Sequence, residues 1–235
     1  MKKLVYLVAF SSLMYGLVPL KATDISATNA TIGGGSSSIN GNLGVCATAT
    51  GTASFAQYYS YAAGTGSVAM GNNSHANGVQ SMALSSGVAN GDYSFAAQGS
   101  QTFGLYSTGF SYGYAPGAYS FAGGYGNSMG QNSFSYSYSG ISHGDFAASF
   151  GQYTGANAYN CFAIGRYNLA SYGTNGMTTW IDTDPLFEIG NGADGAHRAD
   201  AFVVYKNGNG LIHGTFRCAA GGDLSMGSYT AGTHP

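Results

Sequence analysis

The sequence has very few charged residues. Asp, Glu, Lys and Arg supply 7% of its 235 residues, against about 25% in typical soluble domains. The 7 Lys and Arg residues are spread along the chain and form no basic cluster of the kind that neutralises nucleic-acid phosphates. The composition is therefore unlike that of an ordinary soluble enzyme and argues against a nucleic-acid partner.

Cysteine is also scarce. Cys46, Cys161 and Cys218 are an odd number, so at most one internal disulfide forms and at least one thiol is left over. The sequence does not decide which pair, if any, is joined. No catalytic role is predicted for any of the three.

Long apolar runs are absent after the N-terminus. Lys2 and Lys3 precede a mostly apolar segment, residues 4–18, and Ala22 offers a small residue at a cleavage point. This segment is shorter than the roughly 20 residues of a typical membrane-spanning helix. We therefore expect residues 1–22 to be a signal peptide that is removed. No later stretch suits a transmembrane helix, so the product is expected to be exported and to lie at the cell surface, with the outer membrane, or outside.

Glycine and tyrosine are abundant instead. The chain has 39 Gly and 19 Tyr, and aromatic residues make up 14% of it. Disordered chains usually combine few aromatic residues with a high net charge, whereas the formal net charge here is -2. The chain therefore has enough apolar surface to fold.

A short repeat organises the middle of the chain. Related pentads recur every 13 or 14 residues, and they begin at Ser54, Ser67, Ser81, Ser94, Ser107, Ser120, Ser133, Ala147 and Cys161. A second step of small residues, such as Asn77-Gly78, follows each pentad. Several glycines per repeat exclude a helix, because each costs about 1 kcal/mol relative to alanine. The pattern predicts an all-β solenoid of stacked coils, each with two short strands and two turns.

Alternation within the pentad predicts two faces, because strand side chains point to opposite sides with period two. The second and fourth positions are mostly apolar and are predicted to stack as the solenoid core: Phe55, Val68, Met70, Met82, Leu84, Phe95, Phe110, Phe121, Phe134, Phe150, Phe162 and Ile164. The third position is small in every copy: Ala56, Ala69, Ala83, Ala96, Gly109, Ala122, Ser135, Ser149 and Ala163. This small column predicts the close approach of another backbone, either a neighbouring subunit or the far wall of the coil.

Tyrosine replaces charge in the repeats. Residues 54–174 contain only Asp92, Asp145 and Arg166 as charged groups, and many tyrosines. Tyrosine suits a half-buried strand surface and packs in ladders. It also gives a rigid contact surface at a low cost in conformational entropy. The two interpretations are compatible.

The pentads that begin at Ser67, Ser120 and Cys161 resemble the S-V-A-I-G head repeats of trimeric autotransporter adhesins, the YadA-like family. The resemblance covers residues 54–174, about half of the chain, in nine registered copies. It implies a left-handed parallel β-roll that forms a homotrimer and binds a protein or glycan on a host, matrix or cell surface. The family's coiled-coil stalk and membrane anchor have no counterpart in this sequence.

The composition changes after about residue 175. Strands are expected at residues 185–189 and 201–205, joined by a polar loop. We interpret residues 175–235 as a β-rich cap or neck, because a solenoid needs its apolar end covered. Residues 23–53 then form a lead-in or first irregular coils.

Segments that partly match cofactor and metal motifs lack the sequence context or spacing that those sites require. Residues 190–195 match G-x-G-x-x-G, but neither the following helix nor the later acidic residue is present. Asp182, Asp184, Glu188 and Asp194 lack calcium-loop spacing and are interpreted as solvated turns. The five histidines form no ligand pair: His75, His143, His197, His213 and His234. No cofactor, metal or catalytic residue is predicted.

The sequence favours adhesion without catalysis. A purely structural envelope or extracellular matrix component stays open as the alternative. An ice-binding array is disfavoured because Thr48 and Thr50 are not continued at the repeat interval. A polysaccharide-cleaving enzyme is disfavoured because Asp92 and Asp145 lie four repeats apart, whereas that chemistry needs paired carboxylates.

Overall fold

A computed structural model describes residues 43–45, 47–170 and 176–215. All regular elements in these ranges are β-strands, which form two sheets. Sheet A has 13 strands: β1 (Leu43–Val45), β3 (Phe55–Gln57), β5 (Val68–Met70), β7 (Met82–Leu84), β9 (Phe95–Ala97), β11 (Thr108–Gly109), β13 (Phe121–Gly123), β15 (Phe134–Tyr138), β17 (Ala148–Gln152), β19 (Phe162–Arg166), β20 (Pro185–Asn191), β21 (Asp200–Tyr205) and β22 (Gly210–Ile212). Sheet B has 9 strands: β2 (Thr48–Ala49), β4 (Tyr61–Ala62), β6 (His75–Ala76), β8 (Val88–Ala89), β10 (Gln101–Thr102), β12 (Tyr114–Ala115), β14 (Asn127–Ser128), β16 (Ile141–Ser142) and β18 (Gly155–Ala156).

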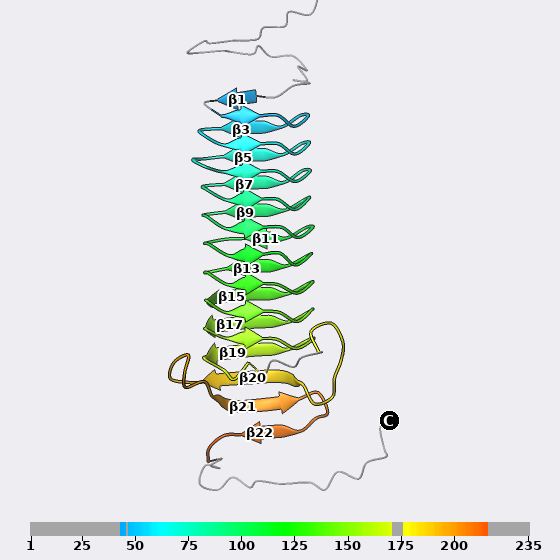
Figure 1. The fold of residues 1–235 in the computed structure, drawn as a ribbon, viewed down its shortest axis with the longest axis vertical. Helices are drawn as coiled ribbons and strands as arrows, with labels where there is room; N and C mark the ends of the chain where they lie inside the picture. The colour runs from blue at the N-terminus through cyan, green and yellow to red at the C-terminus, as the bar shows by residue number, and fades with distance from the viewer. Residues whose placement is uncertain (1–42, 46, 171–175, 216–235) are drawn as a thin grey trace, which may run out of the picture. The chain divides into compact units, whose positions relative to one another are not determined.

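The chain alternates between the two sheets and advances by one strand in each sheet with every coil (Figure 1). Neighbouring coils pair in parallel; for example, Phe55 is in register with Val68, and Val68 with Met82. The parallel β-solenoid predicted from the repeat is therefore confirmed. The coils already begin at β1 and β2, within the segment expected to be a lead-in or the first irregular coils.

The interior of the coils between β3 and β19 holds only small side chains. The third pentad position points inward from sheet A, and its alanines are 0% exposed. Sheet B faces it with an equivalent column of Ala62, Ala76, Ala89, Thr102 and their counterparts, also 0% exposed. The two walls touch directly, as where the Ser60 hydroxyl of one wall donates to the Ala69 carbonyl of the other at 2.8 Å. The small column is therefore the core, and its close neighbour is the far wall of the coil.

The predicted core was wrong. The larger apolar residues point outward from sheet A: Phe55, Val68, Met70, Met82, Leu84, Phe95, Phe110, Phe121, Phe134, Phe150, Phe162 and Ile164. Met70, Met82, Phe110 and Phe162 are 37–39% exposed, and the others are half-buried. The period of two was right, but the faces were inverted, because a coil of 13 or 14 residues leaves no room inside for a large side chain. The small column is equally wrong as a subunit face, since it is closed off within one chain.

Glycine is required at one turn because successive coils approach closely there. A Cβ atom on Gly104 would overlap the carbonyl oxygen of Gly117, and a Cβ on Gly117 would overlap that of Gly130. The serine that opens the next pentad closes this turn. The backbone N–H of Ser107 donates to the Gly104 carbonyl at 3.2 Å, and its hydroxyl donates to the same oxygen at 2.7 Å. Serine at the first pentad position therefore places a hydroxyl where the turn carbonyl can accept its hydrogen bond, as at Ser81, Ser120 and Ser133.

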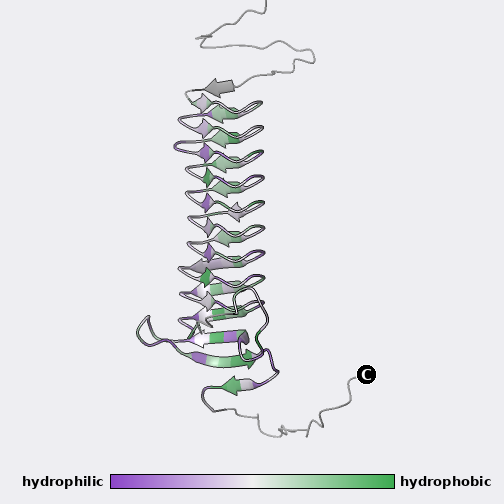
Figure 2. Ribbon diagram, turned by 45° about the vertical axis from the view of Figure 1, so that its right-hand side comes forward, coloured by the Kyte–Doolittle hydropathy of each residue, from purple (hydrophilic) through white to green (hydrophobic). Residues whose placement is uncertain are grey.

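Sheet A continues past the repeats into the C-terminal segment. β20 pairs in parallel with β19, and β21 and β22 then add in antiparallel fashion. Phe162 is in register with Phe187, so the outer aromatic column passes into the cap without a break. The two strands expected in this segment exist, and β22 was not predicted. Figure 2 shows apolar residues recurring from coil to coil down to these last strands.

The narrow interior predicts opposite outcomes for neighbouring residues of β13. Ala122→Leu should destabilise the protein by about 3 kcal/mol, because inward methyl groups meet the far wall. Phe121→Leu, on the outer surface, should cost about 1 kcal/mol or less. Denaturant unfolding followed by circular dichroism measures both. Equal, small losses would contradict the assignment of the small column as the core.

Candidate binding surfaces

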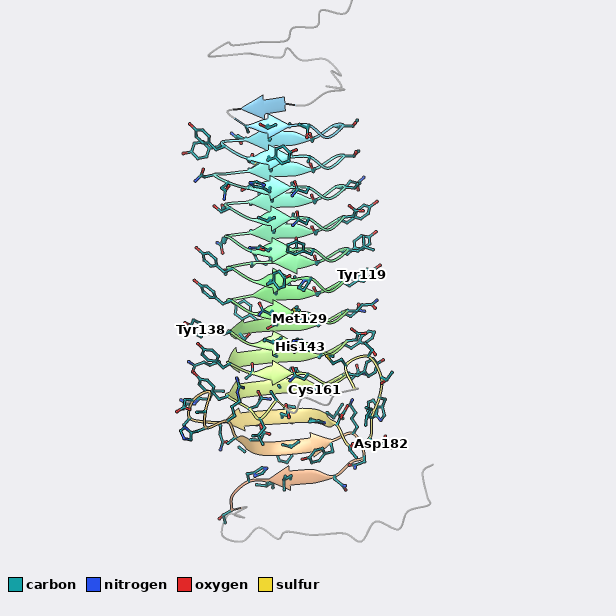
Figure 3. The ribbon with its side chains drawn as sticks, viewed as in Figure 1. Tyr119, Met129, Tyr138, His143, Cys161 and Asp182 are labelled. Carbon is teal, nitrogen blue, oxygen red and sulfur yellow. The ribbon has the colours of Figure 1, made fainter. Side chains whose placement is uncertain are left out.

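Four exposed surfaces run along the coils: the outer face of sheet A, the outer face of sheet B, and the two edges where the chain turns between the sheets. Figure 3 shows Tyr119 and Tyr138 at opposite edges, with Met129 and His143 between them. Each surface repeats with every coil, because the strands stack in register.

The outer face of sheet A is apolar, and we call it the apolar face; it consists of the outward residues listed above. Its phenylalanines form a continuous ladder from coil to cap. Successive ring centroids lie 4.6–6.2 Å apart through Phe95, Phe110, Phe121, Phe134, Phe150, Phe162, Phe187 and Phe202. A contiguous apolar surface of this kind is unusual on a monomeric soluble protein.

Tyrosines form a ladder on each edge. The first ladder contains Tyr93, Tyr106 and Tyr119, whose ring centroids are 4.8 and 5.2 Å apart. The second ladder contains Tyr112, Tyr125, Tyr138, Tyr153 and Tyr167, with centroid distances of 4.8–5.9 Å. These spacings follow the separation of paired strands, which is about 4.8 Å. The predicted tyrosine ladders therefore exist, and their members lie on the turns, apart from Tyr138, which is the last residue of β15.

The backbone at the turns holds these tyrosines outward. Tyr106 has φ 56 and Tyr119 has φ 57 degrees, in the left-handed region that bulky residues rarely adopt. Each is fixed by a hydrogen bond to the previous coil: Tyr119 N–H donates to the Leu105 carbonyl at 2.8 Å. The rings are about half exposed, with Tyr119 at 51% and Tyr138 at 55%. The ladders are thus rigid, exposed and aromatic.

The outer face of sheet B is chemically mixed. Its outward column contains Tyr61, His75, Val88, Gln101, Tyr114, Asn127 and Ile141. Polar side chains pair along it, with Asn77 donating to Asn90 at 2.7 Å and His143 contacting Asn157 at 2.8 Å. Such variety does not form the regular array that a crystal surface such as ice would require.

The four acidic residues interpreted as solvated turns do not form a shared site, and the interpretation is wrong for Asp184 and Glu188, which are buried. Asp182 accepts a hydrogen bond from Trp180, Asp184 lies 3.6 Å from the Lys206 ammonium, and Asp194 binds His197. Glu188 is buried and accepts a hydrogen bond of 2.6 Å from Asn168 Nδ2. Among residues 43–45, 47–170 and 176–215, no three His, Cys, Asp or Glu side chains gather in a way that could hold a metal.

The two carboxylates within the repeats support turns. Asp92 accepts a hydrogen bond from the Val79 N–H at 2.8 Å, and Asp145 accepts one from the Gln131 N–H at 2.7 Å. Each binds the turn of the preceding coil. They are on the same edge, but each already has a structural partner.

Close packing against the last coil explains glycine in the segment at residues 190–195. A Cβ atom on Gly190 would meet the backbone of Asn168 at 2.6 Å. The Arg166 side chain donates to the carbonyl oxygens of Gly192 and Ala193 at 2.8 and 2.9 Å. The loop is therefore tied to the last coil. His234 lies outside the described residues, and His213 lies just after β22.

Cys161 occupies a serine slot. Its side chain is buried and free, and burial raises the pKa of its thiol above the usual value, with the Glu188 charge adding to the effect. Cys46 and Cys218 lie outside the described residues. A buried, protonated thiol is a small apolar side chain and a poor nucleophile.

Comparisons with known proteins add no assignment. A scan of the chain against protein-family models finds no match, and a search of curated proteins finds none either. No helix in the part of the chain that the structure describes is long and apolar enough to cross a membrane.

Glu188 makes the stability depend on pH. Burial, followed by the negative charge of Asp200, raises the pKa of Glu188 from 4.5 to about 7, against the lowering effect of the Asn168 hydrogen bond. Between these values the folded chain holds a proton that the unfolded chain has lost. The free energy of unfolding therefore contains the full contribution of Glu188 below about pH 4.5. This contribution falls by about 3 kcal/mol as the pH rises to 7, and it is constant above that pH.

Glu188→Gln should remove this loss, because the neutral amide still accepts the bond from Asn168. We expect the variant to be more stable than the parent at pH 8 and about equal at pH 4.5. Urea unfolding at the two pH values tests it, with Asp182→Asn as the exposed control. A parent whose stability does not fall over this range would contradict the burial of Glu188.

The Cys161 thiol should be protected in the folded protein. In a Cys46→Ser, Cys218→Ser background, a maleimide at pH 8 is expected to label Cys161 only after unfolding in denaturant. Labelling followed by mass spectrometry provides the measurement. Rapid labelling of the native protein would show that the serine slot is open to solvent.

Proposed function

We propose that this chain is an exported surface protein whose solenoid mediates adhesion to a host, matrix or other cell surface, without catalysis. The observation that carries the proposal is the pair of rigid tyrosine ladders along the edges of the coils. Tyrosine combines large contact area with a hydroxyl that can form hydrogen bonds and loses little conformational entropy on binding.

The absence of convergent chemistry in the repeats supports binding over catalysis. The described carboxylates at Asp92 and Asp145 hold neighbouring turns, and the Cys161 thiol is buried and protonated. A repetitive surface instead makes many similar contacts. Many weak contacts give a strong attachment when they act together.

The active form in this proposal is a homotrimer. The apolar face runs along the coils into the cap, and a contiguous surface of this kind favours coverage by other copies. The resemblance to YadA-like head repeats supports three copies. In such a trimer the apolar face lies inward, and the tyrosine ladders remain at the surface. The subunit contacts are thus made by the large outward column, not by the small column.

A structural role in an envelope or extracellular matrix is the second candidate. The specific feature that favours it is β22, whose residues are all exposed and which pairs only with β21 in the described sheet. An open sheet edge can add strands from other chains. Polymer formation without ligand binding would support this role.

The adhesion proposal predicts separate effects for the ladders and the apolar face. Beads coated with the protein should attach to a layer of reconstituted extracellular matrix or to an epithelial monolayer. Tyr106→Ala with Tyr119→Ala should reduce attachment several-fold without changing the mass in solution. Phe121→Asp should reduce both the attachment and the mass in solution, because it places a charge in the proposed subunit interface.

Tyr114→Ala, on the outer face of sheet B and outside both ladders, is the matched control and should attach like the parent. Attachment of the Tyr106→Ala, Tyr119→Ala variant at the level of the parent on both surfaces would remove the first ladder from the adhesion proposal. A parent that attaches to neither surface would favour the structural role.

A further inference from the structure

The outer face of sheet B contains a small cleft at its last strand. Gly155 in β18 occupies the outward position that Ile141 holds in the preceding coil. A hollow of about 30 Å³ lies beside Gly155 and is lined by Ile141, His143, Tyr153, Gly155, Asn157 and Arg198 among others. The cleft therefore combines a cation, an aromatic ring and polar groups at one end of the second tyrosine ladder.

Arg198 is held in a fixed position at this cleft. Its Nη1 atom donates to the carbonyl oxygens of Tyr153 and Asn168 at 3.0 and 3.1 Å, and its guanidinium lies 5.7 Å from the centre of the Tyr167 ring. Its Nε and Nη2 groups have no hydrogen-bond partner among the described residues. A guanidinium fixed in this way offers a pair of parallel donors, which is the arrangement that carboxylates prefer.

The surroundings favour an anion. None of the described residues that line the cleft is acidic. Asp194, on the loop before Arg198, binds His197 at 2.9 Å, and Asp200, after Arg198, accepts a hydrogen bond from the Leu169 N–H at 3.0 Å. On the opposite wall, the Oδ1 atom of the buried Asn157 amide accepts from His143 Nδ1 at 2.8 Å, and its Nδ2 atom donates to the Ala170 carbonyl at 3.0 Å. His143 and Asn157 are thus already paired, whereas the buried Thr154 hydroxyl is not. Arg198 is the one Arg, Lys, Asp or Glu residue among the described residues of the lining.

Size limits what enters. A water molecule needs about 10–15 Å³ of accessible cavity, so a hollow of about 30 Å³ takes two oxygen atoms but no sugar ring. The ring of a bound sugar would lie outside the cleft. There it meets Tyr153, and Tyr138, whose ring centroid is 5.7 Å from that of Tyr153. Aromatic faces attract the polarised C–H groups of a sugar, because the face of the ring is negative.

We propose that this cleft binds the carboxylate of an acidic sugar, with the sugar ring against the second tyrosine ladder. The proposal rests on the adhesion function above and assigns a ligand class to it. Uronic and sialic acids share the required carboxylate. A surface rich in such sugars would present one carboxylate to each copy of the chain, and several copies would bind together.

Isothermal titration of the whole protein tests this site with defined probes. Trigalacturonic acid and sialyllactose are the acidic probes, and a neutral galactose trisaccharide and lactose are their controls. The parent should bind at least one acidic probe more tightly than its neutral control, and which one distinguishes the two sources of the carboxylate. Arg198→Gln should weaken that binding about tenfold or more.

Arg166→Gln is the matched control. It removes the same charge and two hydrogen bonds to carbonyl oxygens, those of Gly192 and Ala193, but lies outside the cleft. It should bind the acidic probe like the parent. Ile141→Trp is a second test that leaves Arg198 intact, because the larger side chain fills the cleft from sheet B; it should also abolish the preference.

Equal binding of acidic and neutral probes by the parent would overturn the proposal. So would equal losses in the Arg198 and Arg166 variants, which would show diffuse charge attraction, or undiminished binding in the Ile141 variant. Bead attachment separates this outcome from the adhesion function. If the Arg198 variant still attaches to the matrix layer through its tyrosine ladders, only the acidic-sugar site fails.

Discussion

Backbone hydrogen bonds between successive coils set the dimensions of everything else in this protein. Each strand pairs in parallel with the strand one coil away, so equivalent residues are stacked at about 4.8 Å. The chain must also reverse direction twice within 13 or 14 residues, which brings the two sheets face to face. Alanine, serine and glycine fit between them, as the 0% exposure of Ala69 and Ala122 shows. Larger side chains have only the outside to occupy.

The function proposed for the chain follows from this displacement of large residues. A compact protein hides its phenylalanines and tyrosines, whereas this fold arranges them in ladders on its surface. On sheet A the ladder is apolar and suits contact with identical copies. On the edges it carries hydroxyl groups and suits contact with other surfaces. In the proposed function, assembly and attachment are assigned to different sides of the same coil.

Much of the fold can be predicted from the sequence, because the spacing of the repeat gives the register in which successive strands pair. The spacing of the pentads predicted the coils, and the glycines predicted the turns. The assignment of faces failed because large apolar residues usually mark a core. The coil is too narrow to hold the large apolar residues inside, and this width becomes visible only in the close approach of Ser60 and Ala69. The small third column was the signal that could have identified the interior.

The cap and the cleft were harder to predict. Glu188 and Asp184 look like solvated turn residues, yet they are buried against Asn168 and Lys206, which are distant in sequence. The cleft brings Arg198 to Tyr153, 45 residues earlier. One local signal existed: Gly155 interrupts the outward column of sheet B. The sequence does not show that Arg198 lies beside this glycine and borders the cleft.

The central claim is that the apolar face of sheet A is an interface between copies of the chain. The mass in solution of residues 23–235, measured by light scattering, tests this most directly. The account predicts a single species of three times the chain mass. A folded, monodisperse monomer would contradict it, because the phenylalanine ladder would then be stable while exposed to water.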